Sequence, residues 1–224
     1  MIVKTQGKCF GCGEKYTPVK GRTHLLKCTD VLQSLRSDAE LSEGYLIRVS
    51  WAELPDAYWM LIGVPKNLSL YILDEFLRDT WLECCGHLSM FIIHKRFYAS
   101  YPEPDSDDMS MEKQISQIVS VGLKFDYVYD MGSSTDLKLK ILGTIEACPQ
   151  EKVTLLMQND PPLLPCKSCK KEAHIICSLC GETTCQNCSE RHSCAVQEKD
   201  TYMLMPLVNS PRAGICGYEG SSRS

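Results

Sequence analysis

Apolar and polar residues alternate along residues 44–54, GYLIRVSWAEL, and this period of two is typical of a half-buried β-strand. Pro55 and Asp56 then give a turn signal. A nearly continuous apolar run, AYWMLIGV, fills residues 57–64 and ends before Pro65. The pattern therefore predicts two strands separated by a turn.

The hydrophobic period next becomes that of a helix. Asn67 and Ser69 supply polar side chains for a helix start, and apolar side chains then recur near helical spacing until about Glu83. These side chains are Leu70, Leu73, Leu77 and Trp81. We expect a helix over this stretch and a short apolar strand at 88–93.

An acidic loop with two prolines occupies residues 101–109. Beyond it the pattern predicts a helix at 111–121 and two strands, at 125–129 and 137–145, around a turn at 131–134. One last strand is predicted at 153–157. This order of elements is typical of an α+β fold, in which helices pack on a mainly antiparallel sheet.

Potential metal ligands gather near the N-terminus with the spacing C-x2-C-x11-H-x3-C. Glycines beside the first two cysteines permit a tight turn around a metal, and a helix would place the histidine and the last cysteine on one face. This spacing predicts a zinc finger whose ligands are Cys9, Cys12, His24 and Cys28.

Eight more potential ligands lie within residues 166–194. Tetrahedral zinc takes four, so we expect two sites. We expect a cross-brace, as in B-box and RING-like modules, in which the first ligand pair shares one zinc with the third pair and the second pair shares the other zinc with the fourth. Sequential pairing is the alternative, and His174 is expected to be a surface histidine. The eight are Cys166, Cys169, Cys177, Cys180, Cys185, Cys188, His192 and Cys194.

Zinc accounts for these cysteines better than disulfides do. The sequence begins MIVKTQGKCFGCG, without the apolar segment of a secretory signal, and no stretch approaches 18 uninterrupted apolar residues. We therefore expect a cytoplasmic protein with three zinc ions and no membrane segment. Four protein ligands at each site leave no open position, so a structural role is expected for each ion.

Charge is distributed unevenly. The formal net charge is −4, but residues 1–36 carry +5, residues 37–165 carry −10 and residues 166–224 carry +1. A basic finger attracts nucleic-acid phosphates, which favours a nucleic-acid-binding or regulatory protein. An acidic domain suits a basic protein partner, so an adaptor that uses the cross-brace module is the alternative. The basic candidates are Lys4, Lys8, Lys15, Lys20, Arg22 and Lys27.

Common catalytic motifs are absent from the sequence, so a non-enzymatic function is favoured and no small-molecule substrate is evident. An unrecognised enzyme site in residues 44–157 is a further alternative. It would use His87 and His94, which flank the strand at 88–93, with nearby acids. Adjacent Cys84 and Cys85 are expected to be buried, and Cys216 to lie in a mobile tail without a role.

Several short motifs follow one another along the chain in the order found in a known protein family. They are Pro55-x3-Trp59, Ile62-Gly63-Val64-Pro65, His87-Leu88-x2-Phe91 and Phe125-x-Tyr127-x-Tyr129-Asp130-Met131-Gly132. Together they resemble the plasmid pRiA4b ORF-3-like family over about residues 44–157. The resemblance implies the α+β fold and an association with mobile elements, and the family has no settled activity. Archaeal members tend to add a cysteine-rich module and a tail like residues 209–218.

The chain departs from that family at three positions, where an aromatic residue, a tryptophan and a histidine are usual: Met131, Thr135 and Leu137. A polar site on this hairpin is therefore not expected here. The domains predicted from the sequence are a zinc finger at 1–36, the α+β domain at 44–157, a two-zinc module at 158–196 and a flexible tail at 197–224.

Overall fold

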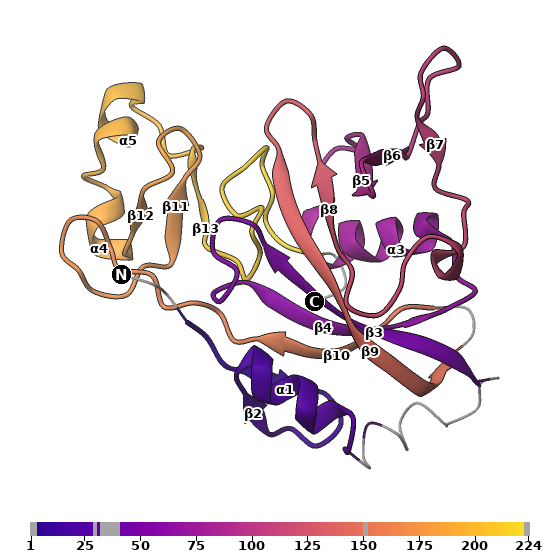
Figure 1. Ribbon diagram of the computed structural model, residues 1–224. Helices are drawn as coiled ribbons and strands as arrows, with labels where there is room; N and C mark the ends of the chain where they lie inside the picture. Colours follow the sequence, from indigo (N-terminus) through magenta and orange to yellow (C-terminus); the bar gives the residue numbers. More distant parts are fainter. Residues whose placement is uncertain (1–3, 29–30, 32–40, 150–151, 222–224) are drawn as a thin grey trace.

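The computed structural model describes residues 4–28, 31, 41–149 and 152–221. Within them, ten strands form one sheet in the order β2-β1-β10-β4-β3-β9-β8-β5-β6-β7 (Figure 1). Every neighbouring pair except β6–β7 is antiparallel, which confirms a mainly antiparallel α+β fold. The strands are β1 (Gly7–Cys9), β2 (Lys15–Tyr16), β3 (Leu41–Trp51), β4 (Trp59–Pro65), β5 (Ser89–Ile93), β6 (Arg96–Ala99), β7 (Met109–Ser110), β8 (Lys124–Tyr129), β9 (Thr135–Pro149) and β10 (Thr154–Asn159).

In the described part of the chain, this sheet is covered by the helices α1 (Pro18–Leu25) and α3 (Leu70–Leu77). The Oγ of Ser69 caps α3 by accepting from the Ile72 N–H at 3.5 Å, and a π-helical turn, η1 (Arg78–Leu82), continues it. The helix predicted from residue 70 to about 83 is thus confirmed, with a change of winding near its end. No helix among the described residues has the length and apolar content needed to span a membrane.

Strand β4 is buried along its whole length because both faces of the sheet are covered. Met60 and Ile62 face the larger core with α3, whereas Trp59 and Leu61 face a second core with α1. Figure 1 shows α3 and α1 on opposite sides of the sheet.

The N-terminal segment, which we define as residues 7–28, belongs to the main sheet. Strand β1 pairs with β10, so that Cys9 lies opposite Met157. Helix α1 approaches so closely that a Cβ on Gly21 would lie 2.6 Å from the Met157 sulfur. The predicted finger therefore shares its core with the central domain. Residues 29–30 and 32–36, at the end of the predicted zinc-finger domain, lie outside the described part of the chain.

The helix predicted at 111–121 is wrong. Strand β7 ends just before this stretch, at Ser110, and the stretch itself contains a single 3-10 turn, η2 (Ile115–Gln117). Its backbone is engaged elsewhere, since the Ile115 N–H donates to the Leu68 carbonyl at 2.8 Å and the Tyr71 N–H to the Met111 carbonyl at 2.9 Å. The apolar spacing reflects core contacts made from a loop. Strand β6, which pairs with β5, was not predicted either.

A second, three-stranded sheet lies in the C-terminal part of the chain, at the left of Figure 1. Its order is β12-β11-β13, and two short helices accompany it. The elements are β11 (Ile175–Cys177), β12 (Thr183–Thr184), α4 (Gln186–Ser189), α5 (Ser193–Glu198) and β13 (Leu204–Pro206).

The prediction of a flexible tail at 197–224 does not fit the packing of its described residues. Strand β13 lies in this stretch, and Ser210, Arg212 and Tyr218 are buried. The Ser210 hydroxyl donates to the Trp81 carbonyl at 2.6 Å. Composition pointed to flexibility because the contacts of this tail are polar and long-range, and such contacts leave no periodic pattern.

Candidate metal centres

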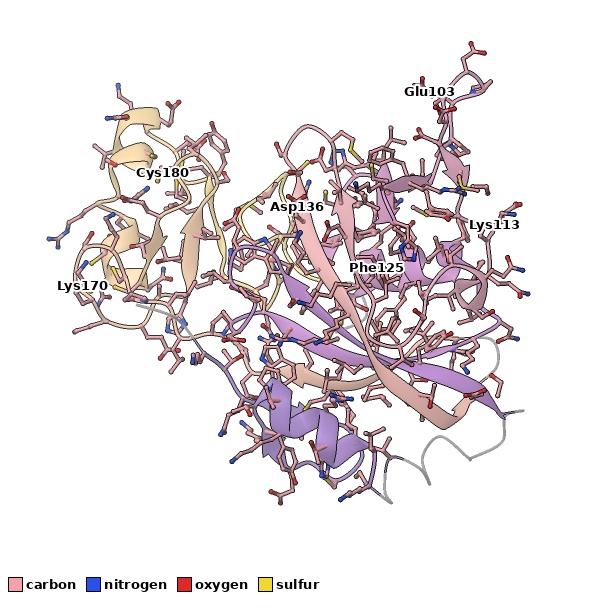
Figure 2. The ribbon with its side chains drawn as sticks, viewed as in Figure 1. Glu103, Lys113, Phe125, Asp136, Lys170 and Cys180 are labelled. Atoms are coloured by element: carbon pink, nitrogen blue, oxygen red, sulfur yellow. The ribbon has the colours of Figure 1, made fainter. Side chains whose placement is uncertain are left out.

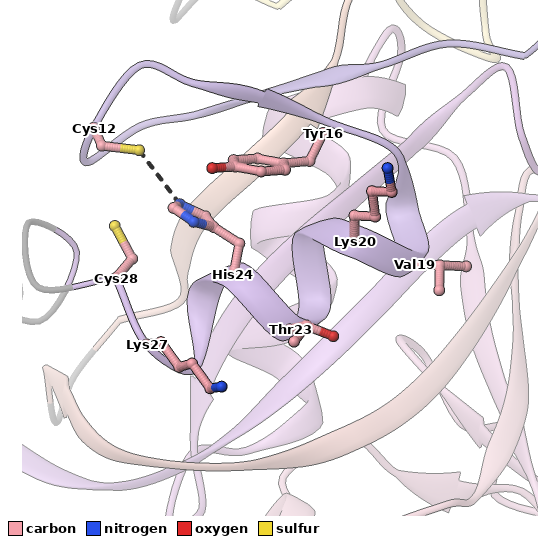
Figure 3. Close-up of a pocket in the computed structure, with 8 residues that line it drawn as sticks. All are labelled: Cys12, Tyr16, Val19, Lys20, Thr23, His24, Lys27 and Cys28. Atoms are coloured by element: carbon pink, nitrogen blue, oxygen red, sulfur yellow. Dashed lines mark hydrogen bonds between the residues drawn. The ribbon is translucent and has the colours of Figure 1, made fainter.

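The structure gathers the predicted N-terminal ligands into one cluster, the N-terminal group (Cys9, Cys12, His24, Cys28). Cys12, in the β1–β2 turn, faces His24 on α1, and its sulfur lies 3.3 Å from His24 Nε2 (Figure 3). Helix α1 ends at Leu25, so Cys28 reaches the cluster from beyond the helix rather than from the same helical face. All four ligand atoms lie within 4.8 Å of one another.

The eight C-terminal residues form two clusters with the cross-brace pairing, and the sequential pairing is not the one observed. In the first C-terminal group the Cys169 and Cys185 sulfurs are 3.6 Å apart. In the second, the Cys180 sulfur lies 3.3 Å from His192 Nε2. The groups are Cys166, Cys169, Cys185 and Cys188, and Cys177, Cys180, His192 and Cys194.

One hairpin turn occurs three times in these clusters. In the pairs Cys9/Cys12, Cys166/Cys169 and Cys177/Cys180 the residue after the second cysteine has a positive φ: Gly13 at 79°, Lys170 at 64° and Gly181 at 72°. Its N–H donates to the carbonyl of the first cysteine at 2.9, 3.0 and 2.8 Å respectively. This turn brings both sulfurs of a pair to the same side, so local geometry prepares half of each site.

The distances fit a metal and not a disulfide. The thirteen cysteines whose side chains are described are free. A disulfide requires sulfurs about 2.05 Å apart, whereas tetrahedral bonds of about 2.3 Å to zinc place two sulfurs about 3.8 Å apart. The observed 3.6 Å between Cys169 and Cys185 is close to the second value. The clusters are therefore compatible with metal binding.

The thiols differ in pKa because their surroundings stabilise the charged thiolate to different extents. Hydrogen bonds from backbone N–H groups, that of Cys169 first, lower the pKa of the Cys166 thiol to about 5. Burial instead raises the pKa of the Cys9 thiol to about 11. The thiolate is the metal-binding form, so Cys9 depends on a cation to become charged.

A shallow hollow lies beside the N-terminal group. The Tyr16 ring stacks on the His24 imidazole, with ring centres 4.2 Å apart. Lys20 and Lys27 reach its edge from α1 and the residues after it (Figure 3). The full lining is Cys12, Tyr16, Val19, Lys20, Thr23, His24, Lys27 and Cys28.

A fourth cluster was not predicted. We call it the central group, and it consists of Cys84, Cys85, His87 and Cys216. The expectation of a buried Cys84–Cys85 pair is wrong for Cys85, which is exposed, and Cys84 is half-buried. The sequence signal was the local spacing C-C-x-H, but its fourth member is 129 residues beyond the histidine.

The two histidines considered for acid–base chemistry do not meet. His87 precedes β5 and His94 follows it, so the strand's five residues separate them. The Nε2 of His87 lies 3.3 Å from the Cys216 sulfur and 3.7 Å from Asp130 Oδ2. His94 lies in the turn between β5 and β6, with a φ of 52°. His174, expected at the surface, belongs to none of the clusters found among the described residues.

The chain matches no protein-family model and no curated protein. Among solved structures it is similar to a protein of unknown function from Methanosarcina mazei Go1, with 16% identity and a TM-score of 0.45. The likeness covers 53% of this chain and 69% of that one.

Proposed function

We propose that this protein is a non-enzymatic zinc protein that contacts nucleic acid through its N-terminal segment and acts in regulation. Zinc is proposed because four convergent ligands, either four cysteines or three cysteines with one histidine, are typical of structural zinc sites. The three predicted sets meet this condition, and each ion would stabilise a segment with few core residues.

The observation that supports nucleic-acid contact best is the composition of the hollow. Lys20 and Lys27 are exposed at its edge, and beside them the apolar side chains of Val19 and Leu26 are 76% and 46% exposed. Ammonium groups around a concave surface suit phosphates, and exposed apolar side chains suit the sugar and base surfaces between them.

Two of the six basic candidates already have partners within the protein. Lys15 forms an ion pair with Asp160 at 2.8 Å, and the Arg22 guanidinium donates to the Leu142 carbonyl at 2.6 Å. Lys20 and Lys27 therefore become the residues of choice for a test, with Lys4 and Lys8 as further exposed candidates.

The test is fluorescence anisotropy of labelled duplex DNA and single-stranded RNA with the zinc-loaded protein over a range of salt concentrations. We expect affinity to fall steeply with salt, and the slope for duplex DNA to decrease by about 1.8 in Lys20→Ala/Lys27→Ala, since each phosphate contact contributes about 0.9. The control is Lys113→Ala/Lys124→Ala, which removes two exposed lysines of the central domain. Equal slopes in both variants, or no binding at low salt, would contradict the proposal.

The second candidate is a protein-interaction adaptor. It is favoured by exposed apolar side chains on the C-terminal part, where Leu179, Val196 and Tyr202 are 54%, 60% and 67% exposed. Leu179 and Tyr202 each adjoin a residue of one hydrogen-bonded pair, since the Ser178 N–H donates to the Met203 carbonyl at 2.8 Å. Loss of a defined co-purifying protein in Leu179→Ser/Tyr202→Ser, with nucleic-acid binding absent, would favour this function.

We also propose membership of the plasmid pRiA4b ORF-3-like family for residues 44–157, supported by the motifs described above. An enzyme site within this domain remains the third candidate. The relevant test is a sequence profile built from natural relatives of this chain, which should recover family members with the same four motifs. Recovery of another family would contradict the assignment.

A further inference from the structure

We propose that the central group is a fourth zinc site, which fastens the C-terminal tail to the central domain. This inference goes beyond the proposed function and does not depend on it. Three of its ligands precede β5, and Cys216 comes from the tail.

The spacing of the group matches that of the other three. The Cys85 and Cys216 sulfurs are 3.7 Å apart, close to the 3.6 Å between Cys169 and Cys185. The His87 Nε2 to Cys216 Sγ distance is 3.3 Å, the same as in both predicted Cys–His pairs. Tetrahedral zinc with sulfur and nitrogen bonds of about 2.3 and 2.1 Å requires about 3.8 and 3.6 Å.

The loop that carries the first three ligands is fixed by its own contacts. The carboxylate of Glu83 accepts hydrogen bonds from the Gly86 N–H at 2.5 Å and the Tyr129 hydroxyl at 3.2 Å. Gly86 has a φ of 72°, which turns the chain between Cys85 and His87. The His87 ring packs edge-on against Tyr129.

The tail is held independently of the cysteines. Arg212 is fully buried, and its guanidinium donates to Asp130 Oδ2 and to the Ser133 carbonyl, both at 2.6 Å. Four residues later Cys216 adopts a φ of 50°, an uncommon conformation for a residue other than glycine. This turn presents its sulfur to Cys85 and His87.

The local charge and the donor set favour a soft or borderline divalent cation. The Arg212 guanidinium lies 3.6 Å from the Cys84 sulfur, so a positive charge adjoins the sulfur ligands of the group. Three thiolates with one imidazole are a common zinc set, and the protons of the thiols pass to solvent on binding. Cys85 and Cys216 are exposed, so this ion would be more accessible than those of the other groups.

The first test counts zinc by elemental analysis of protein loaded with zinc and desalted under reducing conditions. We expect four ions per chain, one for each of the four groups found among the described residues, and one fewer in Cys85→Ser/Cys216→Ser and in His87→Ala. His94→Ala is the matched control because this exposed histidine lies at the other end of β5, and it should retain the wild-type count. Equal counts in wild type and in the double variant would overturn the proposal.

The second test needs no substitution. Cadmium-113 NMR of the cadmium-loaded wild-type protein separates four-sulfur coordination from coordination by three sulfurs and one nitrogen, because the two differ in chemical shift. With the central group occupied we expect one four-sulfur resonance and three resonances of the mixed kind, and without it only two of the mixed kind. Two mixed resonances, or an intact mass that shows Cys85 and Cys216 joined as a disulfide in reducing buffer, would overturn the inference.

Discussion

At the scale of single residues, Arg212 has the most consequential environment in the described chain. Its guanidinium is fully buried, pairs with Asp130, and lies 5.1 Å from the centre of the Tyr129 ring. The hydrogen bond from Arg212 is the main cause that lowers the pKa of Asp130 to about 2. A buried pair of this kind is costly to break because one charge remains without its partner.

We expect Arg212→Gln to lower the free energy of unfolding by about 3–5 kcal/mol, since it leaves the Asp130 carboxylate without its cation. Arg212→Lys should lose less, because the ammonium keeps the charge but cannot keep all of the directed hydrogen bonds. Urea unfolding checks both. Arg191→Gln removes an exposed arginine and serves as the control. A loss below about 1 kcal/mol in Arg212→Gln would contradict this account of the pair.

At the scale of elements, the repeated C-x2-C hairpin is the unit from which three clusters are made. Two copies use glycine at the residue with positive φ, Gly13 and Gly181, and the third uses Lys170. Left-handed backbone costs a residue with a Cβ about 1–2 kcal/mol, which glycine avoids. The turn at Lys170 is therefore strained relative to the other two.

We expect Gly181→Ala to lower the free energy of unfolding of the zinc-loaded protein by about 1–2 kcal/mol. There is open space around this position, so the loss would come from the backbone alone. Lys170→Gly should act in the opposite direction, by less than about 1 kcal/mol, because glycine also gains entropy in the unfolded chain. Gly143→Ala, also in open space but without a positive φ, is the control. Equal effects of the two alanine variants would refute the strain argument.

At the scale of the whole molecule, the three predicted clusters divide into two kinds. The C-terminal groups lie around their own three-stranded sheet, with small separate cores around Cys166 and Cys177. The N-terminal group instead shares its core with Trp59 and Leu61 of β4. Figure 2 shows the side chains of these parts, with Cys180 in the C-terminal part and Phe125 in the central domain. The unfolding caused by loss of metal should consequently extend into the central sheet for the N-terminal group and remain local for the C-terminal groups.

We expect Cys188→Ser to unfold residues 164–206 and leave protection of the central sheet unchanged, because the cores around Cys166 and Cys177 are separate from those of the central sheet. Cys12→Ser should also reduce protection in β10 and β4, since β1 pairs with β10. Hydrogen–deuterium exchange with mass spectrometry measures both patterns. Unchanged exchange in β10 of Cys12→Ser would mean that the N-terminal segment folds as an independent module.

Sequence alone identified the elements whose stability comes from a local pattern. Strand β3 follows from a period of two, β4 from a continuous apolar run, and the start of α3 from a period of 3.6. The C-x2-C spacing marks the metal-ligand pairs because each pair closes its own short turn. Where the pattern had another cause, as at Ile115 and Val119 in a core-facing loop, the same reasoning gave a helix that does not exist.

Only the tertiary structure decided which pairs share a cluster, how the N-terminal segment joins the sheet, and that Cys216 meets His87. Each of these depends on contacts between residues far apart in the chain, such as Ser210 with Trp81 and Arg212 with Asp130. Hydrogen bonds and ion pairs of this kind are directional and have no sequence period, so they become visible only when the fold brings their partners together.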